Sequence, residues 1–481
     1  MILRFDSLRL IDFWSMMQVR LLLVVMPLLL NMMTMIGQNP NIILIMTDDQ
    51  GWFDVGFNGN LMIQTPNLDA LASRGIIFDR FYSASPVCSP TRGSVMTGRN
   101  PYRLGIPDAN VGHLKQEELT IAELLKKEGY ATGHFGKWHL GTLTRKQLDA
   151  NRGGKKINDQ HFTIPTEHGY DQFFCTESKV PTYDPLIYPT NFSEGESKRY
   201  GWKALANRDS GITFGTAYWV ENEKQEDQNL TGDDTKIIMD RVITFIRSAK
   251  ESSTPFFTTV WTHTPHLPVV TSEAYMSKYE GFTHQQKLYY GSITALDDQI
   301  GRLWDELVKL GIEKNTMIWF CSDNGPESKT PGSAGKYRGR KRSLYEGGLR
   351  TPAFLVWGDK IAPGQRSDFP AVTSDYLPSI LGALDVNYPD DRTVDGINIL
   401  PHIGQSKSIE RTKPIGFRYK DQISWVTHQY KLISQDQGKN YELYNLLEDP
   451  YEVKNIAGDQ KALVVSLKMD LDKWLAGLPK E

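Results

Sequence analysis

The stretch Asn41-Ile-Ile-Leu-Ile-Met46, followed by Thr47-Asp48-Asp49-Gln50-Gly51, decides the fold class of this chain. The first part is a near-continuous apolar run rich in β-branched residues, which predicts a strand buried on both faces. Two carboxylates follow at its carboxyl end, where open parallel sheets collect their ligands. The stretch therefore predicts an α/β fold with a polar site at one edge of a parallel sheet.

Further apolar runs of the same kind alternate with amphipathic helical patterns along the chain. The runs are residues 130–135, 256–261, 317–321 and 352–357. Between them, Thr65-Pro66 can start a helix by a cap and a first-turn proline, and residues 119–127, 236–246 and 293–310 have helical periodicity. We expect a large mixed, mostly parallel sheet flanked by helices, with these five runs as parallel strands.

Two regions depart from the alternation. Residues 141–232 are polar and rich in Gly, Pro, Tyr and Asn, and they are too long for an ordinary connection, so we interpret them as an insertion over the site. Beyond residue 386, short apolar runs precede a helical pattern near 462–475, which predicts a smaller C-terminal α+β subdomain. The expected organisation is a leader over 1–37, a main domain over 38–385 and a subdomain over 386–481.

Composition excludes several classes of protein. The chain has 481 residues with 40% hydrophobic and 23% charged residues, which is typical of a globular protein. Its 54 Lys and Arg against 57 Asp and Glu give a formal net charge of −3, so nucleic acid is not an expected partner. Three cysteines, Cys88, Cys175 and Cys321, cannot build a disulfide framework. We expect Cys175 and Cys321 to be buried apolar residues.

The amino-terminal leader has one apolar run, residues 21–30, preceded by Arg20 and interrupted by Pro27. Ten residues are too few for a membrane span, which needs about 20. A basic flank, a short apolar segment and polar residues after it predict a signal peptide over 1–37 and a periplasmic or secreted protein without a stable membrane span. The alternative is a hydrophobic helix that stays on the protein.

Polar side chains follow the predicted strands, and carboxyl ends of parallel strands meet at one edge of the sheet. They are Asp48 and Asp49, Lys137 and His139, His263 and His266, and Asp323 and Asn324. Carboxylate and amide oxygens are hard ligands that suit Ca²⁺ or Mg²⁺. Each Asp pair can alternatively form a turn, but their joint placement favours a metal site.

The segment Cys88-Ser89-Pro90-Thr91-Arg92-Gly93 predicts the start of a helix, with Ser89 as its cap and Pro90 in first position. Arg92 then lies one turn from Cys88, whose pKa we expect the helix end to lower. A buried, inert thiol is the alternative. The string resembles the Cys-x-Pro-x-Arg signature of type I sulfatases, which are arylsulfatase-like and include bacterial polysaccharide sulfatases. This resemblance implies an alkaline-phosphatase-like fold and oxidation of Cys88 to formylglycine (3-oxoalanine).

The resemblance extends over nearly the whole chain after the leader and implies a role for each landmark. Asp48, Asp49, Asp323 and Asn324, together with the modified Cys88, stand where the family holds a divalent cation, with Ca²⁺ expected and Mg²⁺ as the alternative. Arg92 holds the modified residue, Lys137 and Lys341 hold the sulfate, His139 is the candidate base, and His263 matches the leaving-group histidine. We also expect His266 and Lys179 to contact substrate.

The resemblance further implies a sulfated carbohydrate substrate, such as oligosaccharides of an algal polysaccharide of ulvan or carrageenan type, or a glycosaminoglycan. It implies maturation by a formylglycine-generating enzyme or an anaerobic sulfatase-maturating enzyme. Residues 336–342 carry five cations, either as a solvated loop or as a contact for a polyanionic substrate. The rival functions are a phosphonate or phosphate ester hydrolase and a noncatalytic sulfated-glycan binding protein.

Overall fold

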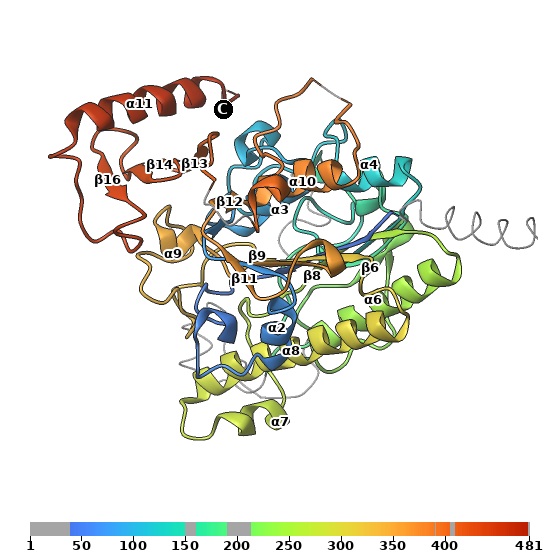
Figure 1. The fold of residues 1–481 in the computed structure, drawn as a ribbon. Coiled ribbons are helices and arrows are strands. Elements are labelled where there is room, and N and C mark those ends of the chain that lie inside the picture. Colours follow the sequence, from blue (N-terminus) through green and yellow to red (C-terminus); the bar gives the residue numbers. More distant parts are fainter. Residues whose placement is uncertain (1–38, 150–159, 190–212, 390, 405–408, 480–481) are drawn as a thin grey trace, which may run out of the picture. The chain divides into compact units, whose positions relative to one another are not determined.

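A ten-stranded sheet forms the centre of the computed structural model, which describes residues 39–149, 160–189, 213–389, 391–404 and 409–479 (Figure 1). The predicted signal peptide lies outside these residues. In spatial order the strands are β11 (Gln365–Ser367), β2 (Ile76–Phe78), β10 (Phe354–Trp357), β9 (Thr316–Ser322), β1 (Asn41–Thr47), β8 (Phe256–Trp261), β4 (Ala131–Lys137), β5 (Gln172–Thr176), β6 (Trp219–Val220) and β7 (Lys224–Gln225).

The five central strands, from β9 to β5, are parallel, as expected for most of the sheet. The prediction that residues 352–357 form a parallel strand is wrong, because β10 runs antiparallel to both β9 and β2. An interior antiparallel strand covered on both faces is as continuously apolar as a parallel one. Its residues therefore reveal burial and not direction.

Helices cover both faces of the sheet (Figure 1), because the apolar side chains of β1 alternate between two hydrophobic cores. Ile43 and Ile45 pack against α2 (Pro66–Ala72), α6 (Asp234–Glu251) and α8 (His284–Lys309). Ile42, Leu44 and Met46 pack against α3 (Cys88–Thr97), α4 (Ile121–Lys127) and α10 (Tyr376–Ala383). Successive side chains of a strand point to opposite faces, so one apolar run supplies two cores. The short helices α7 (Glu273–Met276) and α9 (Glu346–Leu349) lie in connections.

The predicted insertion is in part a sheet region. Within residues 141–232, β5 pairs with β4 in parallel, and β6 and β7 extend that edge antiparallel. Phe173, Phe174 and Cys175 of β5 are buried. The apolar run of this strand is short and is flanked by polar residues, so the sequence did not predict it. Residues 150–159 and 190–212 of the segment lie outside the described part of the chain.

The C-terminal region contains the predicted small α+β unit. Its four antiparallel strands are β13 (Ile415–Tyr419), β14 (Gln422–Val426), β15 (Tyr430–Ser434) and β16 (Glu442–Asn445), packed with α11 (Lys461–Ala476). Phe417 and Ile433 share a core with Tyr82 of β3 (Phe81–Tyr82) and Leu349 of α9, and β3 pairs with β12 (Ala371–Val372). The boundary near residue 385 stays a prediction. No helix in the described residues is long and apolar enough to cross a membrane.

Candidate active site

The candidate site lies at the carboxyl ends of β1, β4 and β9 and at the amino end of α3. Thr47 of β1 is in register with Ser322 of β9, so the residues that follow these strands start level with each other. Asp48 and Asp49 follow β1, Asp323 and Asn324 follow β9, and Lys137 ends β4. The structure therefore brings together the residues that sequence analysis placed at this edge of the sheet.

Cys88 is the first residue of α3, and Val87, not Ser89, occupies the cap position. The predicted cap is thus wrong, and Pro90 is the third helical residue, where the first helical turn leaves backbone N–H groups without partners anyway. Arg92 lies one turn further, as predicted. The Cys88 Sγ atom is 3.5 Å from Asp48 Oδ1 and 3.6 Å from Lys341 Nζ.

The Cys88 thiol is not activated in the unmodified chain. Burial, assisted by the charge of Asp323, raises its pKa, while Lys137 and Lys341 act in the opposite direction. The expected lowering by the helix end is therefore wrong, because the thiol is shielded from water and faces carboxylates. A thiol held in its protonated form is a weak nucleophile.

Each buried carboxylate of the site is paired with a buried cation. Lys137 Nζ lies 2.6 Å from Asp48 Oδ2, and Lys341 Nζ lies 2.5 Å from Asp49 Oδ1. Arg92 similarly contacts Asp323 at 2.6 Å. Burial alone would raise the pKa of Asp48, but Lys137, His266 and Arg92 outweigh burial and hold this pKa well below its usual range.

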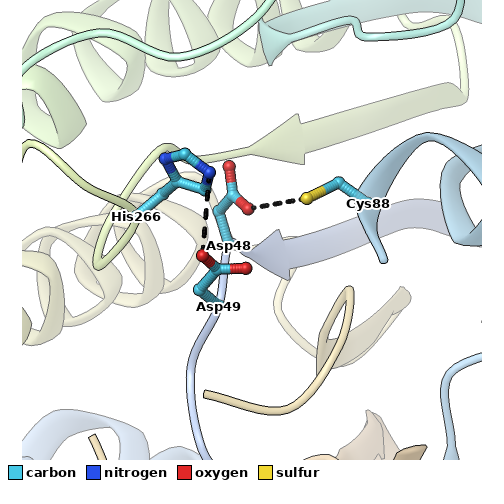
Figure 2. Close-up of side chains that lie close together, drawn as sticks. All are labelled: Asp48, Asp49, Cys88 and His266. Atoms are coloured by element: carbon cyan, nitrogen blue, oxygen red, sulfur yellow. Dashed lines mark hydrogen bonds and ion pairs between the residues drawn. The ribbon is translucent and has the colours of Figure 1, made fainter. Parts of the chain in front are cut away.

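The same residues form a group that can hold a metal ion. Ligand atoms of Asp48, Asp49, Cys88 and His266 all lie within 4.8 Å of one another (Figure 2). Asp49 Oδ2 and Asn324 Oδ1 are buried and have no hydrogen-bond partner among the described residues. Buried oxygens without donors are costly unless a cation or water completes them. Carboxylate and amide oxygens favour a hard cation such as Ca²⁺.

A cavity of about 450 Å³ opens onto these residues. Cys88, Lys137, His139, Lys179, His266 and Lys341 line it. Asn110, also in the lining, accepts a hydrogen bond from His139 Nε2 at 2.8 Å. Both of these residues have left-handed backbones, with φ of 56° at His139 and 64° at Asn110. Such strained conformations concentrate at functional sites.

His263 does not line the cavity, which contradicts its assignment as the leaving-group histidine. Its ring is fully buried, with Nδ1 2.8 Å from Asp234 Oδ2 and Nε2 2.7 Å from Thr176 Oγ1. His266 lines the cavity instead, with Nε2 3.6 Å from Asp49 Oδ2. Both histidines follow β8, and the sequence contains no signal that tells which one the turn directs to the site.

The cation-rich segment 336–342 is mostly engaged within the protein. Arg338 pairs with Glu442, and Arg342 pairs with Glu327 at 2.7 Å. Arg340 donates to backbone carbonyls, among them that of Gly332. Lys341 enters the site, and Arg342 lines the cavity. The interpretation of this run as a broad polyanion contact is therefore not supported.

Comparison with known proteins identifies the family. The protein-family model described as Sulfatase matches residues 40–386. This chain belongs to the sulfatase family. A second model, N-sulphoglucosamine sulphohydrolase, C-terminal, matches residues 335–478 of the sulfatase. Membership makes the protein a sulfuric ester hydrolase.

Relatives of this sulfatase include N-acetylgalactosamine-6-sulfatase of Rattus norvegicus, 32% identical over 412 residues that cover 82% of this chain and 71% of the rat protein. Arylsulfatase G of Mus musculus is 30% identical, covering 75% of this chain and 68% of the mouse protein. The crystal structure of Ps i-CgsB in complex with k-i-k-neocarrahexaose has a TM-score of 0.76 and 27% identity, covering 91% of this chain and 93% of that one. These similarities confirm the expected alkaline-phosphatase-like fold.

Proposed function

We propose that this sulfatase removes sulfate from a sulfated oligosaccharide and that Cys88 is converted to formylglycine for this purpose. The observation that carries the proposal is the position of Cys88, which is buried at the start of α3 and lines the cavity together with Lys137 and Lys341, with Arg92 one turn further along the helix. Sulfate esters are anionic, so a site that attacks them needs cations directed at the sulfuryl oxygens.

Formylglycine, once hydrated, would supply one hydroxyl for attack on sulfur and a second hydroxyl whose deprotonation re-forms the aldehyde and expels sulfate. Asp48, Asp49, Asp323 and Asn324 would hold a divalent cation, with Ca²⁺ preferred, since all four offer buried oxygens and two of these, Asp49 Oδ2 and Asn324 Oδ1, have no hydrogen-bond partner among the described residues. That cation would add positive charge beside the reacting group. The chain's own residues perform the remaining tasks.

Lys137 and Lys341 bind the sulfate group in this proposal. Both are almost completely buried and both enter the cavity. A buried ammonium group stabilises a developing negative charge more strongly than a solvated one, because little water screens it. Lys179 lies at the same cavity, and burial together with the charges of Lys137 and Lys341 lowers its pKa. An anionic substrate group relieves this repulsion, so we assign Lys179 to substrate binding.

His266 takes over the role of leaving-group acid that sequence analysis gave to His263. Its Nδ1 lies 2.7 Å from the carbonyl of Leu267, which can only accept, so Nδ1 carries a hydrogen. The other nitrogen, Nε2, faces the carboxylates of the site (Figure 2), and in the doubly protonated ring it donates a proton to the departing alkoxide. Burial lowers the pKa of His266 to about 4, whereas the charges of Asp48 and Asp49 favour the protonated ring.

His139 is the candidate base. Its Nε2 donates to Asn110 Oδ1, which fixes the tautomer of the ring so that Nδ1 is the basic nitrogen. Proton removal by this ring would assist release of sulfate after the ester bond has broken.

The substrate class follows from the relatives by analogy. One relative is named for N-acetylgalactosamine-6-sulfate chemistry, and one solved neighbour holds k-i-k-neocarrahexaose. We therefore propose sulfated oligosaccharides of algal or glycosaminoglycan origin. Export to the periplasm or medium and maturation by a formylglycine-generating or anaerobic sulfatase-maturating enzyme complete the proposal, on the leader pattern and on the signature at Cys88.

The deciding experiment measures inorganic sulfate and phosphate by ion chromatography. The protein is co-expressed with a formylglycine-generating enzyme and incubated with sulfated algal and animal oligosaccharides, an aryl sulfate and a phosphonate ester. Cys88→Ala is the control, and mass spectrometry of the Cys88 peptide verifies the modification. Sulfate release from a sugar that the control lacks supports the proposal, whereas phosphate release alone favours a phosphonate or phosphate ester hydrolase. Glycan binding without release by modified protein favours a binding protein.

A further inference from the structure

His263, although outside the cavity, connects three segments that build the cavity wall. Its ring is fully buried between the end of β5 and the start of α6. Nε2 lies 2.7 Å from the hydroxyl of Thr176, and Nδ1 lies 2.8 Å from Asp234 Oδ2. Tyr218 donates its hydroxyl to the other oxygen of Asp234. A buried polar group with every partner satisfied fixes the segments that carry it.

The hydrogen bonds of this network have a defined direction. The Thr176 hydroxyl donates its single hydrogen to the carbonyl of Ser178 at 2.7 Å, so it can only accept from His263. Asp234 accepts from Tyr218 and, on its other oxygen, from Nδ1 of the histidine. Both ring nitrogens of His263 therefore act as donors. A change at either end of this chain removes an acceptor that the ring needs.

Both ends of the network reach residues of the cavity. On one side, Thr176 holds the turn at Ser178, and Ser178 and Lys179 line the cavity. On the other side, the carbonyl of His263 accepts a hydrogen bond at 2.7 Å from the backbone N–H of His266. One buried ring thus fixes the two turns that present Lys179 and His266.

We infer that His263 is a positioning residue, which sets the leaving-group acid His266 and the substrate contact Lys179 relative to each other through Thr176 and Asp234. This inference rests on the roles proposed above for His266 and Lys179. Misplacement of such groups by about 1 Å lowers turnover of substrates with poor leaving groups. It matters less for an aryl sulfate whose phenolate leaves without a proton.

The test uses variants that keep the shape of the core. Thr176→Val removes the hydroxyl at nearly constant volume, whereas Thr176→Ser retains a hydroxyl. Asp234→Asn removes the charged acceptor. Its matched control is Asp233→Asn, because this neighbouring cap residue accepts from the backbone of Lys236 and Thr235 and forms no hydrogen bond with His263, Thr176 or Tyr218. Melting temperatures verify that all four fold. Each is assayed, after maturation, for sulfate release from the sugar substrate and from an activated aryl sulfate.

We expect Thr176→Val and Asp234→Asn to lose about 10- to 100-fold in kcat/KM on the sugar substrate and less than about threefold on the activated aryl sulfate. Thr176→Ser and Asp233→Asn stay near the wild type on both. Equal losses on the two substrates, or no loss, would overturn the inference.

Hydrogen–deuterium exchange gives a readout independent of activity. Amides of residues 177–181 and 263–268 exchange faster in Thr176→Val than in Thr176→Ser if the network holds these turns. Unchanged exchange overturns the positioning role. If the wild type releases no sulfate from any sugar, the proposed function fails, and the exchange comparison still decides whether His263 holds the two turns.

Discussion

The Nζ atom of Lys341 lies 3.6 Å from the Sγ atom of Cys88, although 253 residues separate them in the chain. The cysteine begins α3, and the lysine comes from the connection between β9 and α9. Lys341 also pairs with Asp49, so it links the residue to be modified with a candidate metal ligand. Its position makes it a sensitive test of the site.

Lys341→Met should lower kcat/KM for sulfate ester hydrolysis by about 100-fold or more, because it removes a buried cation aimed at the reacting group. The assay is sulfate release, with formylglycine content measured on the same sample to separate catalysis from maturation. Lys336→Met is the matched control, since this exposed lysine belongs to the same cation-rich segment. Equal activity of the two variants would refute the assignment.

His266→Gln should affect substrates according to their leaving groups. A sugar alkoxide needs a proton as it departs, so we expect a loss of about 100-fold or more on the sugar substrate. An activated aryl sulfate should lose far less. The measurement compares kcat/KM for the two substrates, and a uniform loss would contradict the role of leaving-group acid.

The sequence predicted the elements whose residues are buried on both faces. The strands β1, β4, β8 and β9 were expected from their apolar runs, and the site residues at their ends were expected to meet. The direction of β10 was beyond such reasoning, because burial leaves the same pattern in either direction. The strand β5 was not predicted for a different reason, because its apolar run is short and lies within a polar segment.

Details of the site depend on contacts between distant segments, which the sequence cannot reveal. The pKa of Cys88 is raised by burial and by Asp323, which follows β9 and is distant from Cys88 in the sequence. The choice between His263 and His266 depends on how the turn after β8 packs against Thr176 and Asp234. Both candidates are histidines in the same turn after β8, so the residue type could not distinguish them.

A buried ion cluster joins the connection that carries Lys341 to the C-terminal sheet. Lys431 of β15 lies 2.9 Å from both Glu346 and Glu452. Burial and the nearby charge of Glu346 raise the pKa of Glu452 to about 7, although Lys431 opposes the shift. Such a carboxyl binds its proton more tightly in the folded than in the unfolded protein.

This raised pKa predicts a defined pH dependence of stability. The contribution of Glu452 is fully present below its unfolded value of 4.5 and is lost as the pH rises toward about 7. The unfolding free energy of the wild type should therefore fall relative to that of Glu452→Gln as the pH rises from 4.5 to about 7. Urea denaturation at several pH values measures it. A difference that is constant over this range would exclude the shift.

If a divalent cation binds at the proposed site, its removal should destabilise the protein as well as inactivate it. Three buried carboxylates, Asp48, Asp49 and Asp323, repel one another, and a bound cation reduces that repulsion. A ligand at 100 times its dissociation constant adds about 2.7 kcal/mol to stability. We expect a chelator to lower the melting temperature and Ca²⁺ to restore it. Asp49→Asn should blunt this response, and an unchanged melting temperature on chelation would contradict a metal site.

The rate of sulfate release should be proportional to the fraction of Cys88 that has been converted to formylglycine. The unmodified thiol is buried beside Asp48 and Asp323, and burial raises its pKa, so it cannot act as an effective nucleophile. Protein made without a maturation enzyme should therefore release sulfate at less than about 1% of the rate of modified protein. Preparations with graded formylglycine content, quantified by mass spectrometry, should give a straight line of activity through the origin. Cys88→Ser is the control, because serine offers only one hydroxyl and cannot complete the release step. A positive intercept at zero modification would show that the thiol itself, or another group, carries the reaction.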